Sequence, residues 1–215
     1  MNQTAFKSFI FISALLAIIA DFFEINLLFY FLKPLTTSLI ILFLLKHRDT
    51  AAKAYSNLVI IGLLFCLGGD TFLLFPDFFA FGLGAFLIGH LWFIAAFVKE
   101  NGWKFPLKIG IPLAIFGSIL YSLIYTDLGK LFLPVAVYMI VIVIMSWQGI
   151  ALAIKSTKIT FNRVGLAVSL FLFSDALIAL NKFYAPISFS GVIILTTYWM
   201  AIFLLAKSAT NREEI

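Results

Sequence analysis

Four ionisable side chains fall inside long apolar runs of this sequence, and these residues are the natural starting point for chemistry. They are Lys33, Asp70, His90 and Asp175. A charged group in such surroundings is costly, so it is expected to pair, to stay neutral or to serve a function. A carboxyl group donates a proton when neutral and stabilises a nearby cation when ionised. Two buried aspartates therefore point to proton chemistry.

The composition identifies the kind of protein that holds these groups. The chain has 215 residues, of which 63% are hydrophobic and 12% charged, and its mean hydropathy is +1.12. Soluble domains carry about 45–50% apolar and about 25% charged residues. A soluble globular protein, a disordered chain and an ordinary nucleic-acid binder are excluded. The sequence predicts a polytopic integral membrane protein.

Membrane-spanning helices need about 20 consecutive apolar residues each. The sequence contains eight such runs between charged or Gly/Pro-rich breaks. We therefore expect an all-α fold, with residues 1–215 forming a single transmembrane domain without a soluble domain. The expected helices are 6–23, 27–45, 55–75, 78–98, 106–125, 131–154, 161–180 and 186–206.

The distribution of basic residues predicts the orientation of this bundle. With eight spans, twelve of the fifteen Lys and Arg residues fall on the side of the membrane that holds both termini. Cytoplasmic loops of membrane proteins are enriched in Lys and Arg. Both termini are therefore expected to be cytoplasmic, in a multi-pass protein of the cell membrane. The same bias accounts for the net charge of +5 without an anionic partner.

The depths of the four ionisable groups predict one polar pocket. At about 1.5 Å per residue, Lys33, Asp70 and Asp175 lie about 8–10 Å below the outer surface, and His90 lies about 18 Å down. With a single lysine nearby, two aspartates at one depth cannot both be neutralised, so one is expected to keep its proton. A carboxylate pair of this kind performs acid catalysis or proton transport.

Each group also has a purely structural interpretation. Lys33 could extend to the membrane interface or form a structural ion pair with an aspartate, and His90 could be a core histidine. Cys66, which also lies in an apolar run, is interpreted as a small buried hydrophobic residue. Gly82, Ala85 and Gly89 share one helix face, which predicts close helix packing. The sequence has no Cys/His spacing typical of a metal site.

Several stretches resemble the pattern of the YhhN-like lysoplasmalogenase family. The central one combines a Gly-Asp pair, two Phe-x-x-Gly steps and a Gly-His pair followed by Trp. The matching stretches are KPLTT (33–37), LGGDTFLL (67–74), FG (81–82), FLIGHLW (86–92), PVAVY (134–138), FSDAL (173–177) and NKF (181–183).

The resemblance implies hydrolysis of the vinyl ether bond of lysoplasmalogens to a fatty aldehyde and a glycerophosphodiester. Asp70 and Asp175 would act as acid and base, with His90 as a candidate to activate water. Protonation of a vinyl ether carbon and stabilisation of the resulting cation need these two forms of a carboxyl group, as in glycosidases. This mechanism requires no metal and no organic cofactor. The expected partner is a lysophospholipid drawn from the membrane, and no nucleic acid is expected.

A further set of residues is expected to bind the substrate, with Lys33 holding its phosphate as a point charge. This set consists of Lys33, Tyr138, Ser174, Asn181 and Tyr198.

Two other functions use the same buried groups: a proton-coupled carrier, which needs a polar route to both membrane faces, and a non-catalytic lipid-binding or sensor protein.

Overall fold

Over the residues that it describes, the computed structural model is an up-and-down bundle of eight long helices with three short 3₁₀ helices in its loops. It describes residues 3–49, 52–155 and 159–210. The long helices are α1 (Gln3–Phe22), α2 (Asn26–His47), α3 (Lys53–Phe72), α4 (Phe79–Asn101), α5 (Leu107–Ile124), α6 (Phe132–Lys155), α7 (Ile159–Phe183) and α8 (Ser190–Ser208). The 3₁₀ helices are η1 (Pro76–Phe78), η2 (Tyr125–Asp127) and η3 (Gly129–Leu131).

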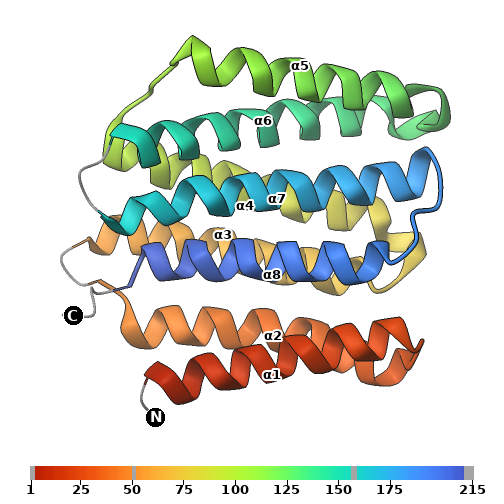
Figure 1. Ribbon diagram of the computed structural model, residues 1–215, viewed down its shortest axis with the longest axis horizontal. Helices are drawn as coiled ribbons and strands as arrows, with labels where there is room; N and C mark the ends of the chain where they lie inside the picture. Colours follow the sequence, from red (N-terminus) through yellow and green to blue (C-terminus); the bar gives the residue numbers. More distant parts are fainter. Residues whose placement is uncertain (1–2, 50–51, 156–158, 211–215) are drawn as a thin grey trace.

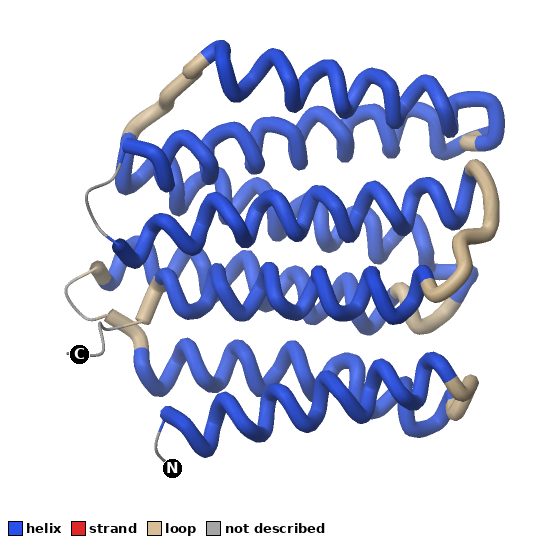
Figure 2. The backbone as a smooth tube through the Cα atoms, viewed as in Figure 1, coloured by secondary structure: helices blue, strands red, loops and turns tan. Residues whose placement is uncertain are grey.

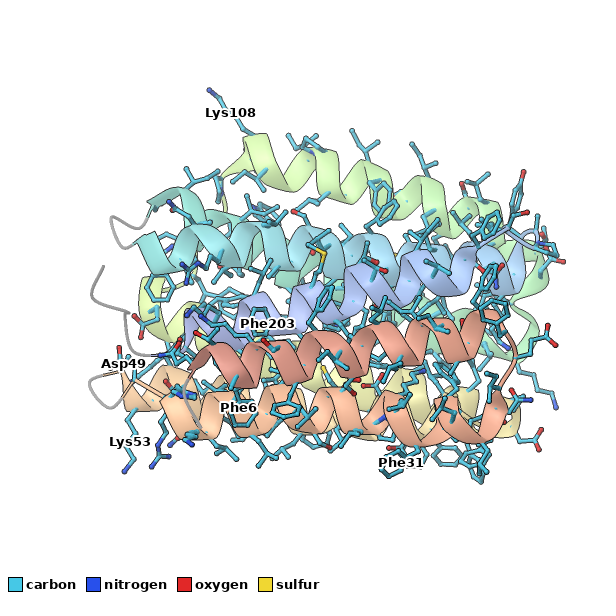
Figure 3. The ribbon with its side chains drawn as sticks, turned by 60° about the horizontal axis from the view of Figure 1, so that its bottom comes forward. Phe6, Phe31, Asp49, Lys53, Lys108 and Phe203 are labelled. Carbon is cyan, nitrogen blue, oxygen red and sulfur yellow. The ribbon has the colours of Figure 1, made fainter. Side chains whose placement is uncertain are left out.

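All eight helices are long and apolar enough to cross a membrane, which confirms the expected all-α membrane fold. They contain 18 to 25 residues, so they are about 27 to 38 Å long at 1.5 Å per residue. Large apolar side chains cover the outside of the bundle; Phe31, for example, is 65% exposed and points outward in Figure 3. The chain is an integral, multi-pass membrane protein.

The third helix differs from the expected one at its end. The sequence predicted a helix over 55–75, whereas α3 ends at Phe72 and is followed by a turn and η1. Pro76 explains the early stop, because a proline disfavours helical backbone in the residue before it. Asp70 therefore lies only two residues from the end of α3.

Helices that follow one another in the chain run in opposite directions, so the loops alternate between two ends of the bundle (Figures 1 and 2). Helix α8 packs on α1, α2, α3 and α7, while α4 packs on α3 and α6. Helix α5 contacts α6 and α7 and lies at one edge, with α1 at the opposite edge (Figure 1). Helix α1 begins and α8 ends at the same end of the bundle.

That end carries most of the basic residues and is called the basic end below. Asp49 and Lys53 lie there, and Lys108 extends from the start of α5 on the same side (Figure 3). Lys46, Lys99, Lys155 and Lys207 occupy the last turns of the helices that end there. Two of the twelve basic residues assigned to this side, Lys158 and Arg212, lie outside the described residues.

Helices α3 and α4 approach each other closely, as the glycines predicted. A Cβ atom on Gly89 would lie 3.0 Å from the backbone oxygen of Gly62, and one on Gly69 would lie 2.5 Å from the ring of Phe86. Larger residues at these positions would push the two helices apart. Small residues at such contacts let backbones approach within a membrane, and here they fix the positions of Asp70 and His90.

Candidate active site

Asp175 of α7 lies in a cluster with side chains from two other helices. The hydroxyl of Tyr138, from α6, donates a hydrogen bond to Oδ2 of Asp175. The Nε2 atom of His90, from α4, lies 3.9 Å from the same oxygen, which is too long for a direct hydrogen bond. Asp175, Tyr138 and His90 are called the Asp175 cluster below.

His90 is held in place by rings instead of hydrogen bonds. The ring of Phe171 lies edge-on at 4.7 Å and that of Tyr138 at 5.2 Å between centroids. The His90 side chain is fully buried, and neither ring nitrogen has a hydrogen-bond partner among the described residues. Buried polar atoms are almost always hydrogen-bonded, so His90 retains capacity to bind water or a substrate oxygen.

A cavity between α4, α5, α6 and α7 reaches the Asp175 cluster. The space between its lining side chains amounts to about 590 Å³, part of which is open to the outside. Among the described residues that line it, Asp175 is the one that can carry a charge, and Tyr138 adds a hydroxyl. Most of the wall is apolar and includes Leu83, Phe86, Leu120, Val135, Met139 and Leu172.

Asp70 of α3 lies in a second cluster with residues of α2 and α8. Its Oδ2 atom accepts hydrogen bonds from the hydroxyl of Thr37 at 2.5 Å and from that of Tyr198 at 2.8 Å. The indole of Trp199 donates to the Thr37 hydroxyl at 3.3 Å. Asp70 is only 1% exposed and does not line the cavity beside Asp175. Asp70, Thr37 and Tyr198 are called the Asp70 cluster below.

Lys33 of α2 belongs to the surroundings of the Asp70 cluster. It interacts electrostatically with Asp70 and with Asp21 of α1. Its ammonium nitrogen lies 5.7 Å from the centre of the Phe29 ring, and the residue is 9% exposed. Lys33 is therefore a buried lysine close enough to two carboxyl groups for their charges to act on it, and it does not line the cavity.

The two clusters are neighbours, but no hydrogen bond or ion pair joins Asp70 to Asp175 among the described residues. The buried thiol of Cys66 is close enough to both aspartates for their charges to act on it. The ring of Phe171 contacts His90 on one side and Tyr198, at 5.5 Å, on the other. The residues selected from the sequence therefore lie near one another. That one of the two aspartates keeps its proton stays a prediction.

Ser174 and Asn181, which were expected to bind substrate, make contacts within the fold. The Ser174 hydroxyl donates to the backbone oxygen of Ile194 at 3.2 Å, which joins α7 to α8. The Asn181 side-chain oxygen accepts from the backbone N–H of Ile187 at 2.8 Å, within the α7–α8 loop. Neither residue lines the cavity beside Asp175.

Sequence reasoning did not single out Thr37 as a partner of Asp70. The signal was present, because Thr37 lies four residues after Lys33 and so shares its helix face. The apolar cavity had no comparable signal, since its Leu, Phe and Met residues resemble lipid-facing ones. Among the described residues, no group of three or more His, Cys, Asp or Glu side chains is arranged to hold a metal ion.

The chain is similar to several known membrane proteins. It is 33% identical to human lysoplasmalogenase TMEM86A over 181 residues, which are 80% of this chain and 74% of the relative. It is 32% identical to human lysoplasmalogenase TMEM86B over 152 residues, or 69% of this chain and 62% of the relative.

A bacterial relative is the uncharacterized membrane protein YhhN of Escherichia coli O157:H7, which is 30% identical over 116 residues, or 54% of this chain and 55% of the relative. No solved structure is significantly similar to the chain. The model of the YhhN family matches residues 28–209, which include every residue of the two clusters. The chain therefore belongs to the YhhN family.

Proposed function

We propose that this protein is a membrane-embedded lysoplasmalogenase, which hydrolyses the vinyl ether bond of a single-chain phospholipid. The observation that carries the proposal is the carboxyl group of Asp175, whose side chain is 12% exposed at the wall of an apolar cavity. Beside it lies a histidine whose two ring nitrogens have no hydrogen-bond partner among the described residues. The relatives named lysoplasmalogenase support the substrate class.

Asp175 is the proposed acid. In its neutral form it transfers a proton to the β-carbon of the vinyl ether, and the electron pair of the double bond forms the new C–H bond. The adjacent carbon and the ether oxygen then share the positive charge of an oxocarbenium ion, beside the Asp175 carboxylate. The Tyr138 hydroxyl stabilises that carboxylate by its hydrogen bond. A stabilising charge near such a cation is the arrangement that glycosidases use.

His90 is the proposed base for water. A water molecule about 2.8 Å from both His90 Nε2 and Asp175 Oδ2 fits two atoms that are 3.9 Å apart. Its oxygen bonds to the cationic carbon while one proton passes to the imidazole. In the collapse of the hemiacetal, its hydroxyl proton returns to Asp175 and the imidazolium protonates the glycerol oxygen. The products are an aldehyde and a glycerophosphodiester, with both side chains restored.

Asp70 has a supporting part in this proposal. It lies outside the cavity and accepts two hydrogen bonds, so it acts through its negative charge and not by touching substrate. In a low-dielectric interior, a charge stabilises a cation over a longer distance than in water. Lys33 and Tyr198 hold this carboxylate in place.

We also propose that the basic end is cytoplasmic, following the bias of Lys and Arg toward that side. The two clusters then lie in the extracytoplasmic half of the bundle, where a single-chain lipid of the outer leaflet reaches them by lateral diffusion. Reporter fusions after Lys53 and after Lys130 test the orientation. The first is expected to report a cytoplasmic site and the second an extracytoplasmic one, and the reverse result would overturn it.

The proposed activity is tested by aldehyde release from 1-alkenyl lysophospholipids with purified protein in detergent. Both ethanolamine and choline head groups are supplied, and matched 1-acyl and 1-alkyl lipids serve as controls. We expect aldehyde from the alkenyl lipids alone. Fatty acid release from the acyl lipid would indicate a different hydrolase. No product from well-folded protein would favour a carrier or a non-catalytic lipid-binding protein, which transport and binding assays in liposomes distinguish.

A further inference from the structure

We propose that Lys182 binds the phosphate group of the single-chain lipid at the mouth of the cavity that contains Asp175. The inference rests on the proposed function, since it names the group that recognises the polar end of that substrate. The sequence assigned this part to Lys33, and the structure offers a second lysine on the Asp175 side of the bundle.

Lys182 continues the stripe of α7 that faces the cavity. Asp175, Ile178 and Ala179 all line the cavity, and Lys182 follows at position i+7 from Asp175. Residues at i, i+3, i+4 and i+7 share one face of a helix. Lys182 lies one residue before the end of α7 at Phe183, so this stripe leads from the proposed acid to the membrane interface.

Two aromatic rings hold the Lys182 ammonium at the cavity mouth. Phe79 and Phe183 both line the cavity, and their rings meet edge-to-face at 5.8 Å. The Lys182 nitrogen lies 4.3 Å from the centre of the Phe79 ring and 5.8 Å from that of Phe183. Such contacts attract the cation without neutralising it. The residue is exposed and forms no ion pair with any carboxylate that the structure describes.

The spacing of Asp175 and Lys182 suits a lysophospholipid. Seven helical residues give a rise of about 10.5 Å. In the substrate, about seven bonds separate the β-carbon of the vinyl ether from phosphorus, or about 8 Å when extended. Asp175 can therefore reach the vinyl ether β-carbon while Lys182 reaches the phosphate of the same lipid molecule. The hydrocarbon chain then extends deeper, along Met139 and Leu172.

Lys33 is less suited to this part. It belongs to the surroundings of the Asp70 cluster, it is 9% exposed, and it interacts electrostatically with the carboxyl groups of Asp70 and Asp21. Binding a phosphate there would require the ligand to displace these interactions. Lys182 keeps its positive charge available on the same side of the bundle as the cavity.

The first test compares kinetics with and without the phosphate. The substrates are 1-alkenyl lysophosphoethanolamine and the phosphate-free 1-alkenylglycerol. For Lys182→Ala we expect KM to rise about tenfold with the phospholipid and to stay unchanged with the alkenylglycerol, with Lys182→Arg close to wild type. Lys130→Ala, which removes a lysine from the same end of the bundle, is the matched control and should behave like wild type. Equal KM changes for both substrates in Lys182→Ala would overturn the proposal.

The second test does not depend on hydrolysis. The uncleavable 1-alkyl lysophosphoethanolamine is titrated into wild type, Lys182→Ala and Lys33→Ala, and binding is followed by intrinsic fluorescence. We expect about tenfold weaker binding for Lys182→Ala, even if the protein releases no aldehyde. Free glycerophosphoethanolamine should bind much more weakly than the lipid. Equal lipid affinity in wild type and Lys182→Ala, or chain-free phosphodiester binding as strong as lipid binding, would contradict the lipid-phosphate site.

Discussion

The Asp70 and Asp175 clusters contain the same kinds of groups but differ in how completely they are satisfied. Asp70 accepts hydrogen bonds from two hydroxyls and is 1% exposed. Asp175 has one hydroxyl donor, an unpartnered histidine 3.9 Å away and a cavity beside it, and its side chain is 12% exposed. A carboxylate can accept about four hydrogen bonds, so Asp175 has more capacity left for a ligand.

This difference distinguishes Asp175, the proposed acid, from Asp70, which is proposed to act through its charge. A carboxyl group that transfers a proton must approach the substrate, and among the two aspartates this is possible for Asp175 in the cavity. A carboxyl group enclosed by donors and a lysine is fixed in position and contributes mainly its charge. Burial of an ionisable group is therefore not sufficient evidence that it reacts.

Apart from the two aspartates, the largest effect is expected for the two histidines. His90→Ala should lower kcat about 100-fold, because general base catalysis contributes about 10²–10⁴-fold. His47 is the matched control, since its ring bonds to the backbone oxygen of Phe43 in the last turn of α2, far along the bundle from the cavity. His47→Ala should keep kcat near wild type. Steady-state aldehyde release gives kcat for both variants. Equal losses of kcat in His90→Ala and His47→Ala would contradict the role of His90 as the base.

A smaller effect is expected from the two tyrosines, one in each cluster. Tyr138→Phe should lower kcat about tenfold, because a hydrogen bond to a charged group contributes about 1.5–3 kcal/mol. Tyr198→Phe removes the equivalent hydroxyl from Asp70 and should lower kcat less than about threefold. Steady-state kinetics of the two variants compare the contributions of the two clusters to kcat. A larger loss of kcat in Tyr198→Phe than in Tyr138→Phe would contradict the proposed roles.

The smallest effect on activity is expected for Thr37→Val, which should act on stability. The change removes a donor to Asp70 and the acceptor for Trp199, so it should destabilise the fold by about 1–3 kcal/mol with little change in kcat. Thr71→Val is the control, because the Thr71 hydroxyl is exposed and bonds only within its own helix. Thermal unfolding in detergent compares them; equal melting temperatures would show that the Asp70 cluster contributes no stability.

The eight membrane spans were predictable because apolar length is a local property of the sequence. Ionisable residues are rare inside these spans, so the sequence also identified Lys33, Asp70, His90 and Asp175. All four lie in or beside the two clusters. The division into two clusters was not predictable, because it depends on how each helix is rotated about its axis. The cavity could not be predicted from the sequence either, because apolar residues that face lipid and those that line a pocket have the same composition.

The most direct test of the account compares Asp175→Asn with Asp70→Asn in aldehyde release from one 1-alkenyl lysophospholipid. Circular dichroism and thermal unfolding establish that both variants are folded. We expect Asp175→Asn to lose at least about 10³-fold in kcat, within the range for a general acid, and Asp70→Asn to lose about tenfold. A larger loss in Asp70→Asn, or substantial turnover by Asp175→Asn, would contradict the assignment of Asp175 as the acid.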